Sequence, residues 1–128
     1  MFRYVSMLML AIFVLSMAVQ YNDPDPIRWM AIYAVPAVYA ALAIRRVYHW
    51  SAIPVALGFL WGVLYWMPGT PIDNPMNLMT DVKMVNLGVE EWREDGGLMI
   101  CAGWMVVLSV VWAVRRRAAA PATAVNPA

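Results

Sequence analysis

The sequence predicts an all-α integral membrane protein, a four-helix bundle with both termini in the cytoplasm. Composition, the length of the apolar segments and the placement of the charges each support this fold class. Of the 128 residues, 63% are hydrophobic and 13% are charged, whereas soluble domains are about 45–50% apolar and about 25% charged. A soluble fold of this length has too little interior for so much apolar surface, so the bilayer is the expected solvent.

Four apolar segments, at about residues 4–20, 27–44, 51–67 and 98–114, have the length of membrane-spanning helices. At a rise of 1.5 Å per residue each covers roughly 26–27 Å, which approaches the hydrocarbon thickness of about 30 Å. Backbone groups in lipid must be satisfied within their own segment, so we expect each segment to be helical. We therefore assign residues 1–117 to a single transmembrane bundle and the Ala/Pro-rich residues 118–128 to a disordered tail.

The first apolar segment also fits a second interpretation, a cleaved signal peptide. Arg3 supplies a basic residue ahead of the run, and Ser16-Met17-Ala18 places small residues where signal peptidase requires them. The run is long for the apolar part of a signal peptide, which favours a membrane span.

Charged residues sort by sign between the two sides of the membrane. Arg3, Arg45-Arg46 and Arg115-Arg116-Arg117 fall at three positions that an even number of crossings places on one side. By the positive-inside rule this side is cytoplasmic. Arginine outnumbers lysine eight to one, which suggests a GC-rich bacterial genome and hence the bacterial inner (plasma) membrane. All eight acids fall on the other side, accompanied by three basic residues: Arg28, Lys83 and Arg93.

Two acidic segments on the outer side form the candidate binding site. One is the turn Gln20-Tyr21-Asn22-Asp23-Pro24-Asp25-Pro26 after the first span, and the other precedes the last span. On a helix, Glu91 and Glu94 share a face, as do Glu90 and Glu94. Carboxylate oxygens gathered there are suited to Ca²⁺, Mg²⁺ or a cationic ligand. The candidate ligand- or cation-binding residues are Asn22, Asp23, Asp25, Glu90, Glu91, Glu94 and Asp95, with Arg28 and Arg93 as supporting charge partners.

The same residues also have a purely structural interpretation. Asp25 followed by Pro26 is a good N-cap and first residue for the second helix. Acids ahead of the fourth span suit the positive end of its dipole, and Arg28 and Arg93 can neutralise them. The sequence leaves both interpretations open.

The outer loop from Pro68 to Asp95 is long enough to hold structure of its own. Beyond Asn74-Pro75, apolar residues recur every three or four positions, which predicts an amphipathic helix in the outer interface. This helix would contain Leu78, Met79, Val82, Val85, Val89 and Trp92. The loop is also the candidate contact for a protein partner, beside the lipid bilayer itself, and no nucleic-acid partner is expected.

No catalytic motif accompanies the acids. The single cysteine, Cys101, and the single histidine, His49, exclude an internal disulfide, multi-cysteine metal sites and paired-histidine haem ligation. Glycine-rich phosphate loops, serine elbows and zinc-protease motifs are missing from the sequence. The leading hypothesis is a non-enzymatic binding or scaffold protein with no cofactor other than the Ca²⁺ or Mg²⁺ considered above. The alternatives are a metal-dependent membrane enzyme acting on a lipid or headgroup, and a small transporter, which the lack of ionisable residues deep in the spans disfavours.

Two signatures in this chain resemble the transmembrane protein 220 family. The first is the turn at residues 20–26 ahead of Trp29, with Tyr33 and Pro36 in the following helix; that family carries a Gln-x-Asn-Asp-Pro-Asp-Pro turn after its first span. The second is Glu91-x-Arg93-Glu94-x-x-Gly97-Leu98 at the entry to the last span. The likeness covers roughly residues 4–114, while Asp95-Gly96 and the methionine-rich loop depart from the pattern. The resemblance implies a small multi-span membrane protein whose first segment is a span, and it implies no particular activity.

Overall fold

Four α-helices make up the described part of the computed structural model, which covers residues 1–69, 76, 78 and 87–120. They are α1 (Phe2–Val19), α2 (Pro26–Ile44), α3 (Ala52–Tyr65) and α5 (Leu87–Ala119), and a 3-10 turn, η1 (Gln20–Asn22), follows α1. No strand occurs in these described ranges. The predicted fold class, an all-α membrane bundle, is therefore confirmed, whereas the cytoplasmic placement of the termini stays a prediction.

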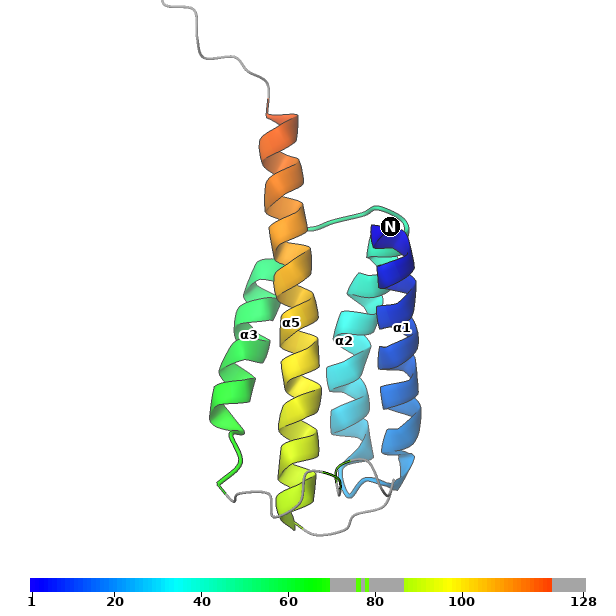
Figure 1. The fold of residues 1–128 in the computed structure, drawn as a ribbon, viewed down its shortest axis with the longest axis vertical. Helices are drawn as coiled ribbons and strands as arrows, with labels where there is room; N and C mark the ends of the chain where they lie inside the picture. Colours follow the sequence, from blue (N-terminus) through cyan, green and yellow to red (C-terminus); the bar gives the residue numbers. More distant parts are fainter. Residues whose placement is uncertain (70–75, 77, 79–86, 121–128) are drawn as a thin grey trace, which may run out of the picture.

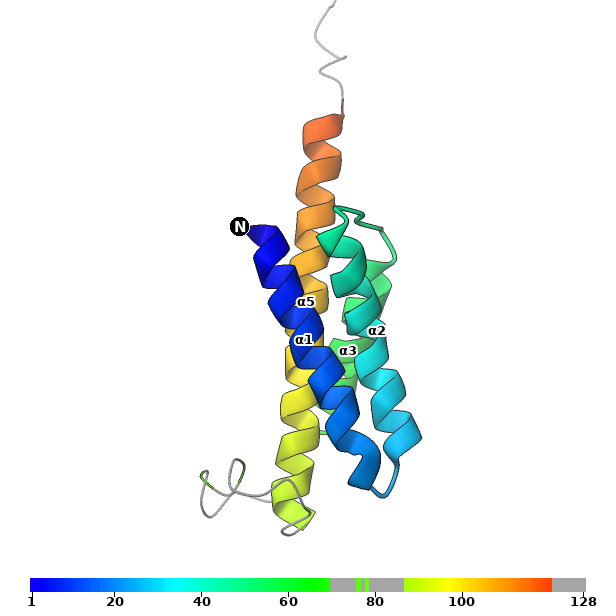
Figure 2. The same cartoon turned by 90° about the vertical axis from the view of Figure 1, so that its right-hand side faces the viewer.

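The helices run along a common direction and alternate in sense (Figure 1). The N-terminus lies toward the same end as the C-terminal part of α5, and the turn between α1 and α2 lies at the opposite end (Figures 1 and 2). We call the first end the arginine end, after Arg3, Arg45, Arg46 and Arg115–Arg117. We call the second end the acidic end, defined by residues 20–26 and residues 90–95.

Apolar side chains cover the outside of the bundle as well as its interior. Leu15 of α1 and Trp61 of α3 are 65% and 66% exposed, and many other large apolar residues on all four helices are exposed as well. A surface of this kind is suited to lipid rather than water. α1, α2 and α5 are long and apolar enough to cross a membrane, while α3, with 14 residues, is shorter. At 1.5 Å per residue α3 covers about 21 Å, less than the hydrocarbon thickness of about 30 Å.

α5 departs most from the predicted boundaries. The sequence predicts an outer loop reaching Asp95 and a span over residues 98–114, but the helix runs from Leu87 to Ala119, 33 residues in all. At 1.5 Å per residue this is about 50 Å, so the helix extends well beyond a hydrocarbon layer of about 30 Å. An acid in its first turn and arginines in its last turn suit the helix dipole, which explains why the charged ends continue the helix. The acidic segment is thus helical and lies outside the apolar part of α5 that begins at Leu98.

Two predicted features fall wholly or largely outside the described residues. Of the predicted amphipathic helix, Val89 and Trp92 belong to α5, and most of the other positions lie outside the described residues. The predicted tail begins at residue 118, but α5 continues to Ala119, and residues 121–128 lie outside the description.

Packing divides the bundle into two helix pairs. α1 packs along α2 and α3 packs along α5, whereas α2 contacts α5 over a shorter stretch and scarcely meets α3. The shared core includes Phe13 of α1, Ala40 of α2, and Cys101 and Met105 of α5, all of which are fully buried. Cys101 is therefore a packing residue in the interior of the bundle.

Aromatic contacts join the two pairs at the arginine end. The ring of Phe2 stacks on Trp104 of α5 with centroids 5.8 Å apart, and it also approaches Tyr48, at 6.0 Å. The guanidinium of Arg115 lies 4.5 Å from the centroid of the Tyr48 ring. These contacts connect α1, the α2–α3 connection and α5.

Candidate functional site

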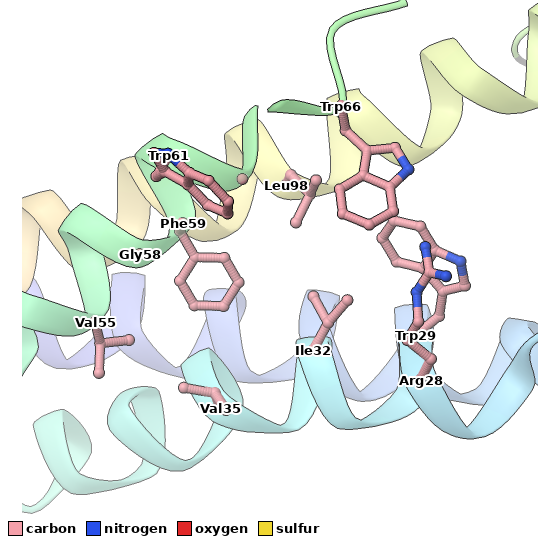
Figure 3. Close-up of a pocket in the computed structure, with 11 residues that line it drawn as sticks. Arg28, Trp29, Ile32, Val35, Val55, Gly58, Phe59, Trp61, Trp66 and Leu98 are labelled. Carbon is pink, nitrogen blue, oxygen red and sulfur yellow. The ribbon is translucent and has the colours of Figure 1, made fainter. Parts of the chain in front are cut away.

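An apolar pocket of about 390 Å³ lies between α2 and α3 (Figure 3). Ile32 and Val35 of α2 line one wall, Val55 and Phe59 of α3 line the other, and Leu98 of α5 lies behind them. The pocket is an open groove rather than a closed cavity. It exists because the two helix pairs diverge where α2 and α3 would otherwise meet.

Glycines of α3 give the groove its depth. Gly58 and Gly62 both line it. A Cβ atom added at Gly58 would meet nothing within 4 Å, and one added at Gly62 would touch only Leu98, at 4.0 Å. Gly-x-x-x-Gly pairs often let membrane helices pack closely, but here only Gly62 is near a neighbouring helix.

Arg28 closes the groove at the acidic end. Its guanidinium carbon lies 4.7 Å from the centroid of the Trp66 ring and 5.4 Å from that of Trp29, so it is held by cation–π contacts (Figure 3). Its Nη1 atom lies 3.6 Å from Oδ2 of Asp25. The side chains of this ion pair are 44% and 65% exposed, and such exposed pairs contribute little stability. Arg28 is therefore positioned mainly by aromatic contacts and keeps donors for another group.

The turn at residues 20–26 sets the position of Arg28. The backbone N–H of Asp25 donates a hydrogen bond of 2.8 Å to Oδ1 of Asp23, which fixes the start of α2. Asp25 is the N-cap residue with Pro26 first in the helix, as the sequence predicts. The Asp25 side chain makes no capping hydrogen bond, however, and is paired with Arg28 instead.

Glu94 is the residue that α5 contributes to this site. The side chain of Trp29, which is buried, donates a hydrogen bond to Glu94. Burial raises the pKa of Glu94, and the Asp23 and Glu90 carboxylates raise it further, while Arg28 and the Trp29 hydrogen bond oppose that rise. Asp23, Arg28 and Glu94 are thus close enough to influence one another, although they come from the two acidic segments.

The contact beneath Glu94 is unusually close. Tyr33 of α2 is buried, and its hydroxyl packs directly on the backbone of Gly97. A side chain at residue 97 would occupy the space of this hydroxyl, so glycine is what permits α2 and α5 to approach here.

The other predicted site residues are placed separately. Glu90 pairs with Arg93 at 3.8 Å, Asn22 is exposed at the end of η1, and Glu91 is half-buried on α5. Asp95 is only 5% exposed, and its Oδ1 atom has no hydrogen-bond partner among the described residues; burial raises the pKa of its carboxyl. In the described ranges no three Asp, Glu, His or Cys side chains converge to hold a metal ion. The predicted residues therefore share one end of the bundle without forming a single cage there.

Sequence reasoning missed the groove and the role of Trp66. It assigned Arg28 only to neutralising the nearby acids. One signal was present: Arg28 is the sole basic residue within the four predicted spans, and it lies beside Trp29. A basic side chain next to a tryptophan at a helix end is typical of the membrane–water boundary.

Comparisons with known proteins agree with the membrane assignment. Residues 12–110 match the family model described as transmembrane family 220, helix. The chain is 28% identical over 118 residues to transmembrane protein 220 of Xenopus laevis, an alignment that covers 82% of this chain and 56% of that protein. The chain thus spans little more than half the length of this relative. No solved structure matches. Because the relative is a vertebrate protein, the match supports a membrane location but not the predicted bacterial inner membrane.

Proposed function

The chain belongs to transmembrane family 220, and from this premise we propose that it is a non-enzymatic membrane protein that binds a membrane-resident amphiphile. The ligand contacts the acidic end through its polar part and the groove between α2 and α3 through its apolar part. The predicted site residues Asp23, Asp25 and Glu94 contribute to the polar subsite, with Arg28 at its centre.

One observation carries this proposal: an open apolar groove ends at a positively charged side chain. Ligand pockets are typically about 300–1,000 Å³, mostly apolar and equipped with a few oriented polar groups. The groove, at about 390 Å³, fits that description, and Arg28 supplies the polar group. A soluble ligand would have to enter from water past Arg28, whereas an amphiphile enters sideways from the membrane.

The location of the groove favours a ligand with a long apolar tail. It runs along α2 from Arg28 to Val35, and along α3 from Val55 to Trp66, the residue that follows the helix. At 1.5 Å per residue these stretches are about 10 Å and about 16 Å long. The groove therefore extends from the polar boundary into the hydrocarbon region, as an amphiphile does.

Filling the groove tests the proposal. Gly58 lines the groove and a Cβ added there meets nothing within 4 Å, so we expect Gly58→Leu to fold while its side chain takes up space in the groove and displaces the ligand. Gly103→Leu is the matched control, because Gly103 of α5 is exposed, has open space around it and does not line the groove. Native mass spectrometry of the proteins released from detergent should show a retained lipid adduct in the wild type and in Gly103→Leu, and its loss in Gly58→Leu. Equal retention in all three proteins, or none in the wild type, would contradict the proposal.

A further inference from the structure

We propose that the groove holds one acyl chain of a phospholipid with a phosphate–primary-ammonium headgroup, such as phosphatidylethanolamine, with its phosphate on Arg28. This inference rests on the proposed function and adds the chemical class of the ligand.

The groove lies where acyl chains are the surrounding solvent. Burial of apolar surface does not drive membrane helices together, because lipid tails are as apolar as leucine side chains. α2 and α3 are therefore not forced to close on each other, and the space between them suits an acyl chain of the same polarity as the hydrocarbon around it. The walls present Ile32, Val35, Val55 and Phe59, none of which offers a polar group.

Arg28 matches a phosphate in both position and chemistry. A guanidinium has five N–H donors in a planar fork that suits phosphate oxygens. Its ion pair with Asp25 is long, at 3.6 Å, and open to water. The rings of Trp29 and Trp66 hold the guanidinium at the end of the groove, next to the start of α2, where aromatic residues mark headgroup depth.

The carboxylates around Arg28 select the charge of the rest of the headgroup. Asp25 lies beside the guanidinium, and Asp23 and Glu94 act on the same region. A headgroup that carries only negative charge would meet these acids once its phosphate had reached Arg28. A headgroup with an ammonium attached to its phosphate by a short linker instead places a positive charge where the acids are.

The indole rings favour a primary ammonium over a quaternary one. Quaternary ammonium groups are recognised by open aromatic faces. Here Arg28 already covers one face each of Trp29 and Trp66, and Trp29 is buried. A primary ammonium can donate hydrogen bonds to Asp25 and Asp23, which a choline group cannot do.

Three phospholipids with identical acyl chains test the inference on the wild-type protein. Phosphatidylethanolamine, phosphatidylglycerol and phosphatidylcholine are added in competition to delipidated protein in detergent, and the bound species are counted by native mass spectrometry. We expect phosphatidylethanolamine to be retained at least about tenfold over each of the other two, the discrimination that a single charge-assisted contact can supply. Equal retention of the three lipids would overturn this inference and leave the proposed function standing. If none of them is retained, both fail.

Variants then separate the two parts of the headgroup. Arg28→Gln should weaken retention of all three lipids, while the double variant Asp23→Asn/Asp25→Asn should abolish the preference for phosphatidylethanolamine over the other two. Arg3→Gln, at the opposite end of the bundle, is the control and should behave as wild type. An unchanged preference in the aspartate variant would overturn the assignment of the ammonium to these carboxylates.

Discussion

The contact between Tyr33 and Gly97 yields the sharpest prediction about stability. A Cβ atom at Gly97 would overlap the Tyr33 hydroxyl, and it would lie 3.0 Å from Cζ and 3.4 Å from Cε1 of the ring. The ring cannot swing away freely, because Tyr33 is buried and packs beside the buried Trp29, with centroids 6.4 Å apart. Gly97→Ala must therefore either move the ring or separate α2 from α5.

Overpacking of this kind typically costs about 1–3 kcal/mol. The cost at Gly97 should lie in the upper half of that range, since the hydroxyl and two ring atoms of Tyr33 are affected and the ring is held by its neighbours. Gly103→Ala is the matched control: it makes the same change on the same helix, with nothing within 4 Å of the new Cβ. In this control, glycine is replaced by a better helix former, so stability should be unchanged or slightly higher.

A double-mutant cycle identifies the atom responsible. Tyr33→Phe removes the hydroxyl and leaves Cζ at 3.0 Å, so Tyr33→Phe/Gly97→Ala should recover part of the loss, with a coupling energy of about 0.5–3 kcal/mol. The assay is reversible unfolding in mixed micelles by a denaturing detergent, followed by circular dichroism. If Gly97→Ala unfolds at the same detergent fraction as Gly103→Ala, the close approach of α2 and α5 at this point is refuted. Strict additivity in the cycle would show that the hydroxyl is not the obstacle.

Three other predictions concern separate features of the bundle. Burial and the Asp23 carboxylate raise the pKa of Glu94, so Asp23→Asn should lower that pKa in a carbon-13 NMR titration. A raised acid pKa favours the folded state only while the group is protonated, so the stability of the bundle should fall as pH rises through the folded-state pKa of Glu94. This fall should be smaller in Glu94→Gln. Ala40→Leu, at a fully buried position of α2, should cost about 1–3 kcal/mol, whereas the exposed Ala31→Leu should cost nothing measurable by the same unfolding assay. The positive-inside rule predicts the side of the membrane on which each loop lies, which single cysteines in a Cys101→Ala background can test. An impermeant maleimide added to intact cells should label a cysteine that replaces Tyr21 but not one at residue 118. The reverse labelling pattern would invert the predicted topology.

The sequence predicted the four helices of the described residues, and most of their boundaries, because those features depend on local composition. The apolar runs that predict α1 and α2 end within a few residues of Val19 and Ile44, where proline or arginine follows. α5 is longer than its apolar run because helix formation outside the membrane depends on dipole and side-chain charge rather than on hydropathy. The pattern of apolar residues therefore does not predict the charged extensions of α5.

The site was predictable only in part because it depends on how the helices are rotated. An even number of crossings places the turn at residues 20–26 and the segment at residues 90–95 on the same side, which the sequence shows. Helices that are apolar all round, however, carry no signal for which face is inward. Two contacts in the site depend on those rotations and on the pairing of α1 with α2 and of α3 with α5. They are the hydrogen bond from Trp29 to Glu94 and the cation–π contact of Arg28 with Trp66.

The groove is better explained by the way the two helix pairs are joined than by any single gap in packing. Burial of apolar surface cannot draw the pairs together in lipid, so specific contacts must do so. These include Tyr33 on Gly97 near the acidic end and Phe2 on Trp104 at the arginine end. Between the two, α2 and α3 scarcely meet. Loosening either contact should therefore change the width of the groove, and with it lipid retention, before it unfolds either pair.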